Sequence, residues 1–286
     1  MSSEVLITKK KRTAADRIWT GVLILLAAAF LAPILIVVLN SFKSKFSIVG
    51  RPFELPNAET FVGLANYAAG IRSSGILAAA GRSLFITVGS VLVILLFTSM
   101  TAWYLMQRKT RGTRLLYYLF VFSMIVPFQM VMYTMTYVVT ALRLNNLPGI
   151  ILVYLGFGAG LSVFLFSGFM KSIPGELSEA ACIDGCTPLQ TFFRVILPVL
   201  KPTAVTTAIL NTMWIWNDYL LPYLLLGTRN KTLPVAIQIA MQGAYGAVDW
   251  GGFMAMLVLA LIPIVIFYLI CQKYIIRGVI AGAVKG

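Results

Sequence analysis

The sequence contains no histidine, and this absence excludes several kinds of chemistry at once. Histidine is the usual proton-transfer side chain near neutral pH and the commonest metal ligand, so His-based catalysis and most zinc or iron sites are excluded. The three cysteines, Cys182, Cys186 and Cys271, are too few for a disulfide framework. No G-x-x-x-x-G-K-[ST] motif occurs, so we do not expect this chain to bind a nucleotide. We expect no enzymatic activity, catalytic residue, cofactor or metal in it.

Charged residues are also scarce, at 11% of the 286 residues, whereas 59% are apolar. Soluble domains are about 25% charged and about 45–50% apolar. The chain therefore has more apolar surface than one soluble core can bury, which indicates a membrane protein. No low-complexity linker or long repeat divides it, so we expect one membrane domain.

Six apolar stretches are long enough to cross a bilayer, which takes about 20 residues per helix. The alternating ten-residue segments of a transmembrane barrel are not present, so we predict an all-α membrane protein with six transmembrane helices. The expected spans are about 18–39, 83–106, 115–142, 147–170, 202–228 and 250–272. They leave a basic N-terminus at 1–17, a loop at 171–201 and a C-terminal tail at 273–286.

Lysine and arginine are distributed unevenly between alternate loops. With a cytoplasmic N-terminus, 15 of the 23 basic residues fall on the cytoplasmic side and 8 fall outside. Because cytoplasmic loops carry the excess of basic residues, we expect both termini in the cytoplasm. The short loop 107–114 is decisive, since it holds Arg108, Lys109, Arg111 and Arg114 and no acidic residue.

The basic segment 1–17 followed by an apolar run is reminiscent of a signal peptide. The run 18–39 is longer than an ordinary signal-peptide core, so we interpret it as the first membrane anchor. We attribute the basic segment to orientation and to contact with anionic lipid. Membrane lipid is therefore an expected partner and nucleic acid is not.

The cytoplasmic loop 171–201 contains start and stop signals for two short helices. Gly185 suits the left-handed residue that ends the first helix. The sequence 187–190, Thr-Pro-Leu-Gln, is typical of a capping box that starts the second helix. We expect Pro198 and Pro202 to end this second element before the fifth span.

The spacing in this loop resembles the EAA loop of ABC-importer permeases. That pattern is Glu-Ala-Ala, three residues, Gly, nine residues, then Ile-x-Leu-Pro. It is carried here by Glu179, Ala180, Ala181 and Gly185 and then by Val195, Ile196, Leu197 and Pro198, with Val in place of the first Ile. The alternative is a helix–turn–helix packed for stability alone. A DNA-binding version is not expected, because the loop holds three basic and three acidic residues.

The resemblance implies that this loop docks in a cleft on an ATPase subunit. Small residues let another protein approach closely, and two acidic side chains offer charge to basic residues of that partner. The implied docking residues are Glu179, Ala180, Ala181, Asp184, Gly185, Leu197 and Pro198. Rigid docking there would convert closure of the ATPases into movement of the spans.

Two further segments resemble the carbohydrate importers of the maltose type. The stretch 214–219, Trp-Ile-Trp-Asn-Asp-Tyr, is similar to their Trp-Asn-acid-aromatic segment. The ending 278–286 resembles their C-terminal tail, and the resemblance implies that Gly282, Lys285 and Gly286 reach the ATPase interface. A frayed terminus is the alternative for the tail.

Asp218 is the only acidic residue inside an expected span, so it should face a bundle interior or water rather than lipid. It lies roughly 24 Å along the fifth span at about 1.5 Å per residue, in the outer half of the membrane. Trp214, Asn217 and Tyr219 surround it. Polar groups beside aromatic faces suit a sugar, so these four residues are a candidate translocation path. A structural hydrogen-bonding cluster with interfacial aromatics is the equally weighted alternative.

The resemblance implies the fold of a type I ABC importer permease in the cytoplasmic (inner) membrane of a prokaryote. Its implied partners are a second homologous permease, two ABC ATPase subunits that bind ATP and Mg, and an extracellular or periplasmic sugar-binding protein. The expected cargo is a di- or oligosaccharide, moved by alternating access. The competing hypothesis is an ion-coupled secondary sugar transporter that uses Asp218 as its proton site.

Overall fold

The structure, a computed structural model, describes residues 13–242 and 248–283. Over these residues the chain is helical, and its one β feature is an isolated bridge between Lys43 and Phe61. The helices are α1 (Ala14–Ser41), α2 (Lys45–Gly50), α3 (Ala65–Ser74), α4 (Ile76–Gln107), α5 (Arg111–Ser123), α6 (Phe128–Ala141), α7 (Leu147–Met170), α8 (Glu176–Ile183), α9 (Pro188–Thr191), η1 (Phe192–Ile196, a π-helix), α10 (Leu197–Val199), α11 (Lys201–Asn217), α12 (Leu220–Leu226), α13 (Leu233–Gln242) and α14 (Trp250–Ala283).

Within the described residues, four helices are long and apolar enough to cross a membrane: α1, α4, α7 and α14 through Tyr274. Two bent pairs also pass that test, α5 with α6 at 108° and the α9–α10 segment with α11 at 78°. Counting each pair as one span gives six, the number expected from hydropathy, although the second pair begins at Pro188, inside the loop 171–201, whereas the expected fifth span was 202–228. The residues of the expected spans are therefore helical, but some of the helices are divided.

The stretch 115–142, expected as one helix, is two helices. α5 ends at Ser123 and α6 begins after Pro127. Ser123 is four residues before Pro127, and a proline both lacks the N–H that would bond to that carbonyl and clashes with it. The proline therefore accounts for the break.

The stretch 202–228, also expected as one helix, divides in the same way. α11 ends at Asn217, and Asp218 has an extended backbone with ψ of 123°. Asp218 is four residues before Pro222, which lies in the first turn of α12, where a missing N–H costs nothing. The polar residues singled out in the sequence thus lie at a break in the fifth span.

The expectation that Pro198 would end the second helix of the cytoplasmic loop is wrong. The chain passes through Pro198 in helical form, because the preceding turn is the π-helix η1, in which the Leu197 N–H bonds to the Phe192 carbonyl. The wider turn accommodates the proline. The bend comes later, at Leu200, just before Pro202 in the first turn of α11.

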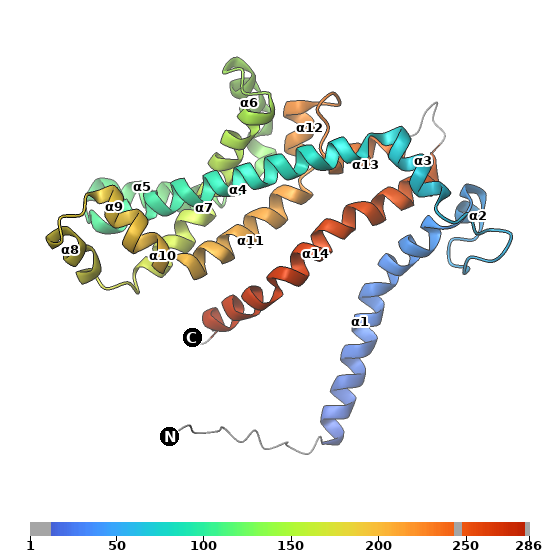
Figure 1. The fold of residues 1–286 in the computed structure, drawn as a ribbon, viewed down its shortest axis with the longest axis horizontal. Helices are drawn as coiled ribbons and strands as arrows, with labels where there is room; N and C mark the ends of the chain where they lie inside the picture. The colour runs from blue at the N-terminus through green and yellow to red at the C-terminus, as the bar shows by residue number, and fades with distance from the viewer. Residues whose placement is uncertain (1–12, 243–247, 284–286) are drawn as a thin grey trace.

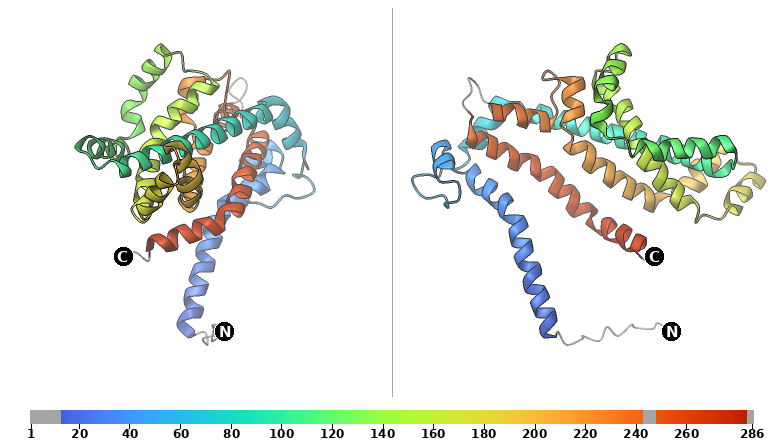
Figure 2. Two further views of the ribbon diagram at one scale, coloured as in Figure 1. Left: turned by 60° about the vertical axis from the view of Figure 1, so that its left-hand side comes forward. Right: turned by 180° about the vertical axis from the view of Figure 1, so that it is seen from behind.

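The core of the bundle lies between α4 and α7, which share the most extensive helix contact, with α11 packed against α4. Fully buried side chains include Ile94, Tyr154 and Phe166, all 0% exposed. In Figures 1 and 2, α1 leaves this bundle near α2 and α3, and its N-terminal end stands clear of the other helices. No residue of the most apolar window of α1 is buried, so α1 presents its apolar surface outward.

Hydrogen bonds between distant segments agree with the topology expected from the basic residues. At one end of the bundle, the Gln107 amide nitrogen donates to the Ser178 hydroxyl at 2.9 Å. At the other end, Arg82 Nη1 donates to the Lys231 carbonyl at 3.0 Å. Each pair joins two segments assigned to the same side of the membrane. Figure 1 shows α8 and α9 at the first end and α2 and α3 at the second.

The outer end carries a small ordered cap built around a buried lysine. Lys43 is 1% exposed, and its Nζ donates to the carbonyls of Arg51 and Glu54 at 2.6 and 2.9 Å. Asn66 on α3 donates to the Lys43 carbonyl at 2.8 Å. A lysine is buried here because backbone carbonyls replace its water, and the bonds tie the end of α1 to the loop after α2.

Candidate functional site

The first helix of the cytoplasmic loop, α8, ends at a left-handed glycine, as the sequence predicts. Gly185 has φ of +80°. Its N–H bonds to the Cys182 carbonyl at 3.0 Å, and the Cys186 N–H bonds to the Ala181 carbonyl at 2.9 Å. These two bonds form a Schellman motif, which fixes the direction in which the chain leaves α8.

The capping box predicted for the second helix is confirmed. The Thr187 hydroxyl accepts from the Gln190 N–H at 3.3 Å, and the Thr187 N–H donates to the Gln190 side-chain oxygen at 2.9 Å. The turn between the two helices therefore runs from Gly185, which follows α8, to Thr187, the N-cap of α9. Local side-chain chemistry fixes the angle between α8 and α9.

The residues of the expected docking surface differ in exposure. Glu179, Ala180, Asp184, Gly185 and Pro198 are exposed, Leu197 is half-buried, and Ala181 is buried. The apolar tip of α8 is open, since Ile183 is 86% exposed. Neither Glu179 nor Asp184 forms an ion pair with any described residue. The loop thus presents an apolar tip flanked by two carboxylates.

α8 packs on α9 and η1, and one hydrogen bond joins it to the end of α4. Gln107 and Ser178 form their hydrogen bond between two cavities of about 420 and 480 Å³. Glu179, Lys109 and Lys171 line the first of these cavities. Both cavities are also lined by Trp103 of α4.

The expected C-terminal contact residues fall only partly within the described structure. Gly282 lies in the last turn of α14, which runs as a helix to Ala283. Lys285 and Gly286 lie outside the described residues. Glycine and small residues in this ending therefore do not prevent helix formation as far as Ala283.

Asp218 faces the bundle and makes three hydrogen bonds. Its Oδ1 accepts from the N–H groups of Leu220 and Leu221 at 3.0 and 3.4 Å, so it caps the start of α12. Its Oδ2 accepts from the Tyr154 hydroxyl of α7 at 2.9 Å. Trp214 packs edge-on against the Tyr154 ring, with centroids 5.5 Å apart. Asp218 and Trp214 thus hold the break in the fifth span against α7.

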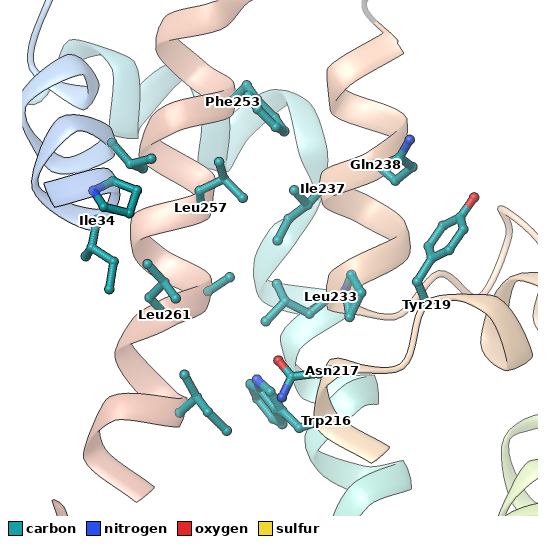
Figure 3. A pocket seen from close by; sticks show the side chains of 15 residues that line it. Ile34, Trp216, Asn217, Tyr219, Leu233, Ile237, Gln238, Phe253, Leu257 and Leu261 are labelled. Atoms are coloured by element: carbon teal, nitrogen blue, oxygen red, sulfur yellow. The ribbon is translucent and has the colours of Figure 1, made fainter. Parts of the chain in front are cut away.

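Asn217 and Tyr219 point elsewhere, into a cavity of about 520 Å³ between α1, α13, α14 and the end of α11. Figure 3 shows Asn217 and Trp216 at one end of this cavity and Tyr219 beside α13. The Asn217 amide nitrogen donates to the Met213 carbonyl at 2.7 Å. The four residues expected to form one path therefore divide into two pairs with different surroundings.

Sequence reasoning did not identify the other residues of this cavity. Gln238 comes from α13, a helix that lies in the expected outer loop between the last two spans. Pro234 just inside the start of α13 is a helix-start signal that marks this segment. Phe253 comes from the first turn of α14, and no local pattern places it opposite α11.

A family model described as "Binding-protein-dependent transport system inner membrane component" matches residues 94–281. The chain is 38% identical over 263 residues to the probable starch degradation products transport system permease protein AmyC of Thermoanaerobacterium thermosulfurigenes, covering 92% of this chain and 94% of that protein. It is 36% identical over 282 residues to the multiple sugar-binding transport system permease protein MsmG of Streptococcus mutans, covering 96% and 100%. It is 33% identical to the melibiose/raffinose/stachyose import permease protein MelC of Bacillus subtilis, covering 96% and 99%.

The fold has a close counterpart among solved structures. The chain superimposes with a TM-score of 0.78 on a chain of a bacterial ABC transporter involved in the import of the acidic polysaccharide alginate. The match covers 92% of this chain and 98% of the other at 24% sequence identity. The overall arrangement of helices is thus the fold of that transporter chain.

Proposed function

The chain belongs to the binding-protein-dependent transport system inner membrane components, and from this membership we propose that it is the permease subunit of an ATP-driven importer of a di- or oligosaccharide. As a member it is a multi-pass protein of the inner membrane and a transport subunit rather than an enzyme. Three relatives are named for starch degradation products, for multiple sugars, and for melibiose, raffinose and stachyose. These names support a sugar as the cargo. The same relatives favour ATP-driven import over ion-coupled transport through Asp218.

The importer would contain a second homologous permease, two ATPase subunits that bind ATP and Mg, and a sugar-binding protein on the outer side. The surface of α1 supports a second permease, because apolar side chains such as Leu25 and Phe30 are 69% and 78% exposed. Lipid can cover part of that surface. The N-terminal end of α1, however, stands clear of the other helices (Figure 1) and is well placed to pack on a neighbour.

The loop 171–201 would dock on an ATPase subunit. The observation that carries this proposal is the rigid α8–turn–α9 unit, which presents Ile183 and the carboxylates of Glu179 and Asp184 at the end of the bundle. An apolar tip flanked by carboxylates suits a partner cleft with basic residues at its rim. The tail residues Gly282, Lys285 and Gly286 would contact the same ATPases.

Transport would follow from movement of this unit. Closure of the ATPases on ATP would draw the two docking loops together, turn α4 through Gln107 and Ser178, and open the pathway outward to receive sugar. Hydrolysis would return it to the inward-open state. In this scheme Asn217 and Tyr219 contact the sugar, whereas Trp214 and Asp218 hold the break in position.

The docking role is tested by reversing one charge on α8. We expect Glu179→Lys to reduce co-purification of the ATPase with the permease, because a lysine would repel basic residues of the cleft. Glu176→Lys is the matched control, since Glu176 is an exposed acid in the same helical turn. Equal co-purification of both variants and the wild type, with unchanged uptake, would contradict docking through Glu179.

A further inference from the structure

The cavity that holds Asn217 and Tyr219 has two chemically different walls. α1 and α14 supply only apolar groups, among them Ile34, Phe253 and Leu257. The opposite wall, formed by residues 216–219 and α13, supplies two carboxamides, a phenol and an indole: Asn217, Gln238, Tyr219 and Trp216. This wall also carries Leu233 and Ile237, and Figure 3 shows these two toward α14, with Asn217 and Trp216 below them and Gln238 and Tyr219 on the far side of α13.

No charged side chain is among the fifteen described residues that line the cavity. Asp218 is adjacent in sequence, but its carboxylate is bonded to Tyr154 and to the start of α12. A ligand carboxylate placed here would lose its water without gaining a cation, which is unfavourable. The cavity therefore discriminates against acidic ligands.

We propose that this cavity is a site for an uncharged sugar, with Asn217 and Gln238 as the residues that determine its specificity; this inference rests on the proposed function. Its volume of about 520 Å³ lies within the roughly 300–1,000 Å³ typical of small-molecule sites. A pyranose has an apolar face and an edge of hydroxyl groups. The apolar wall can pack against the apolar face of the sugar. The carboxamides and the phenol both donate and accept hydrogen bonds, so they can bind its hydroxyl groups.

The solved structure with the same fold belongs to a transporter of an acidic cargo. That transporter is involved in the import of alginate, an acidic polysaccharide. Desolvated uronate carboxylates need cations nearby, and the described lining of this cavity holds no charged side chain. Neutral oligosaccharides are thus the substrate class that this subunit admits.

The experiment uses the complete importer, purified without its sugar-binding protein so that binding to the permease is measured directly. Raffinose and maltotriose are titrated as neutral probes and trigalacturonate as an acidic probe of equal length, with tryptophan fluorescence as the signal. Trp216→Phe identifies the part of the signal that arises in the cavity. We expect saturable quenching by at least one neutral probe and none by trigalacturonate.

Two variants and one control assign the binding to the cavity. Asn217→Leu and Gln238→Leu should each raise the Kd for the neutral probe about three- to tenfold, the effect of losing one net hydrogen bond. Asn145→Leu makes the same chemical change at an exposed loop position outside the cavity and should leave the Kd unchanged.

Three results would overturn the proposal: no binding of either neutral probe, equal binding of trigalacturonate, or an unchanged Kd in both cavity variants. In the first case the cavity is filled by lipid or by a helix of the sister permease. Co-purified ATPase and ATP hydrolysis stimulated by the binding protein are measured in the same preparation. If both are normal, the sugar site alone has failed; if the ATPase is absent, the proposed function has failed.

Discussion

At the scale of single residues, a carboxylate inside a bilayer is tolerated only where the protein supplies donors. Asp218 has three, the Tyr154 hydroxyl and the N–H groups of Leu220 and Leu221. Its carboxylate is therefore used to cap the start of α12 and to fix the break between α11 and α12 against α7. This arrangement favours the structural alternative over a role in the sugar path.

The variant Asp218→Asn distinguishes a helix-capping role of Asp218 from a role as a proton-binding site. We expect Asp218→Asn to retain uptake within about threefold of wild type, because its oxygen still caps α12 and its amide can donate to Tyr154. Asp218→Ala should lower the free energy of unfolding by about 2 kcal/mol, since it removes the cap and leaves the Tyr154 hydroxyl unpaired. Uptake in reconstituted vesicles and thermal unfolding of the purified complex measure the two effects. Loss of uptake in Asp218→Asn with normal unfolding would indicate proton coupling instead.

The sequence identifies Asp218 as unusual but cannot say what it faces. Its partner Tyr154 is 64 positions away, and no local pattern connects them. The same limit applies to the neighbouring residues 214, 217 and 219. Trp214 and Asn217 both lie on α11 before the break, where Trp214 packs on Tyr154 and Asn217 lines the cavity. On a continuous helix of about 3.6 residues per turn, Tyr219 would lie on nearly the opposite side from Asn217, but after the break at Asp218 it lines the same cavity.

At the scale of helices, the sequence predicts where a helix begins or ends when the residues responsible lie within one turn of that point. The end of α8 at Gly185 and the start of α9 at Thr187 follow from residues within one turn, so the sequence suffices. The effect of a proline is less local. Pro127 and Pro222 break their spans four residues upstream, whereas Pro33 and Pro263 lie inside continuous helices α1 and α14. Tertiary packing decides whether a proline breaks the helix, and no local sequence pattern reveals that packing.

The bond between Gln107 and Ser178 joins the docking loop to the longest helix of the bundle core. It is a direct polar contact between α8 and α4, and it lies beside the apolar contact that η1 makes with α4, where the rings of Phe192 and Trp103 are 5.7 Å apart. We expect Gln107→Leu and Ser178→Ala each to reduce the amount of sugar transported per ATP hydrolysed about threefold, a change of the size expected for one hydrogen bond. The double variant should be no worse than either single one, since both remove the same bond.

Two controls separate coupling from assembly in that experiment. Gln107→Glu should restore the stoichiometry, because the Ser178 hydroxyl can donate to a carboxylate. Gln272→Leu makes the same change at an exposed position near the cytoplasmic end of α14 and should have no effect. Additive losses in the double variant, or no rescue by glutamate, would assign the two residues to folding rather than to coupling.

At the scale of the whole molecule, the basic residues predict the orientation and the long-range hydrogen bonds agree with it. This prediction uses only the basic residues of the loops, so it does not depend on where a helix is divided as long as each bent pair counts as one span. Two side chains at opposite ends make the orientation measurable. Phe53 in the outer cap is 81% exposed, and Ile183 at the tip of α8 is 86% exposed.

Single cysteines at these two positions test topology and docking together, after Cys182, Cys186 and Cys271 are replaced by serine. A membrane-impermeant maleimide should label Phe53→Cys in right-side-out vesicles and Ile183→Cys in inside-out vesicles, because each side chain is exposed on one side only. When the ATPases are bound, labelling of Ile183→Cys should fall at least about tenfold, since a docked interface core excludes water, while Phe53→Cys stays unchanged. Labelling of both cysteines from the same side would reverse the assigned topology. Unprotected Ile183→Cys in a complex that still holds its ATPases would mean that the partner contacts α8 away from its apolar tip, so that the exposed carboxylates, rather than Ile183, carry the docking.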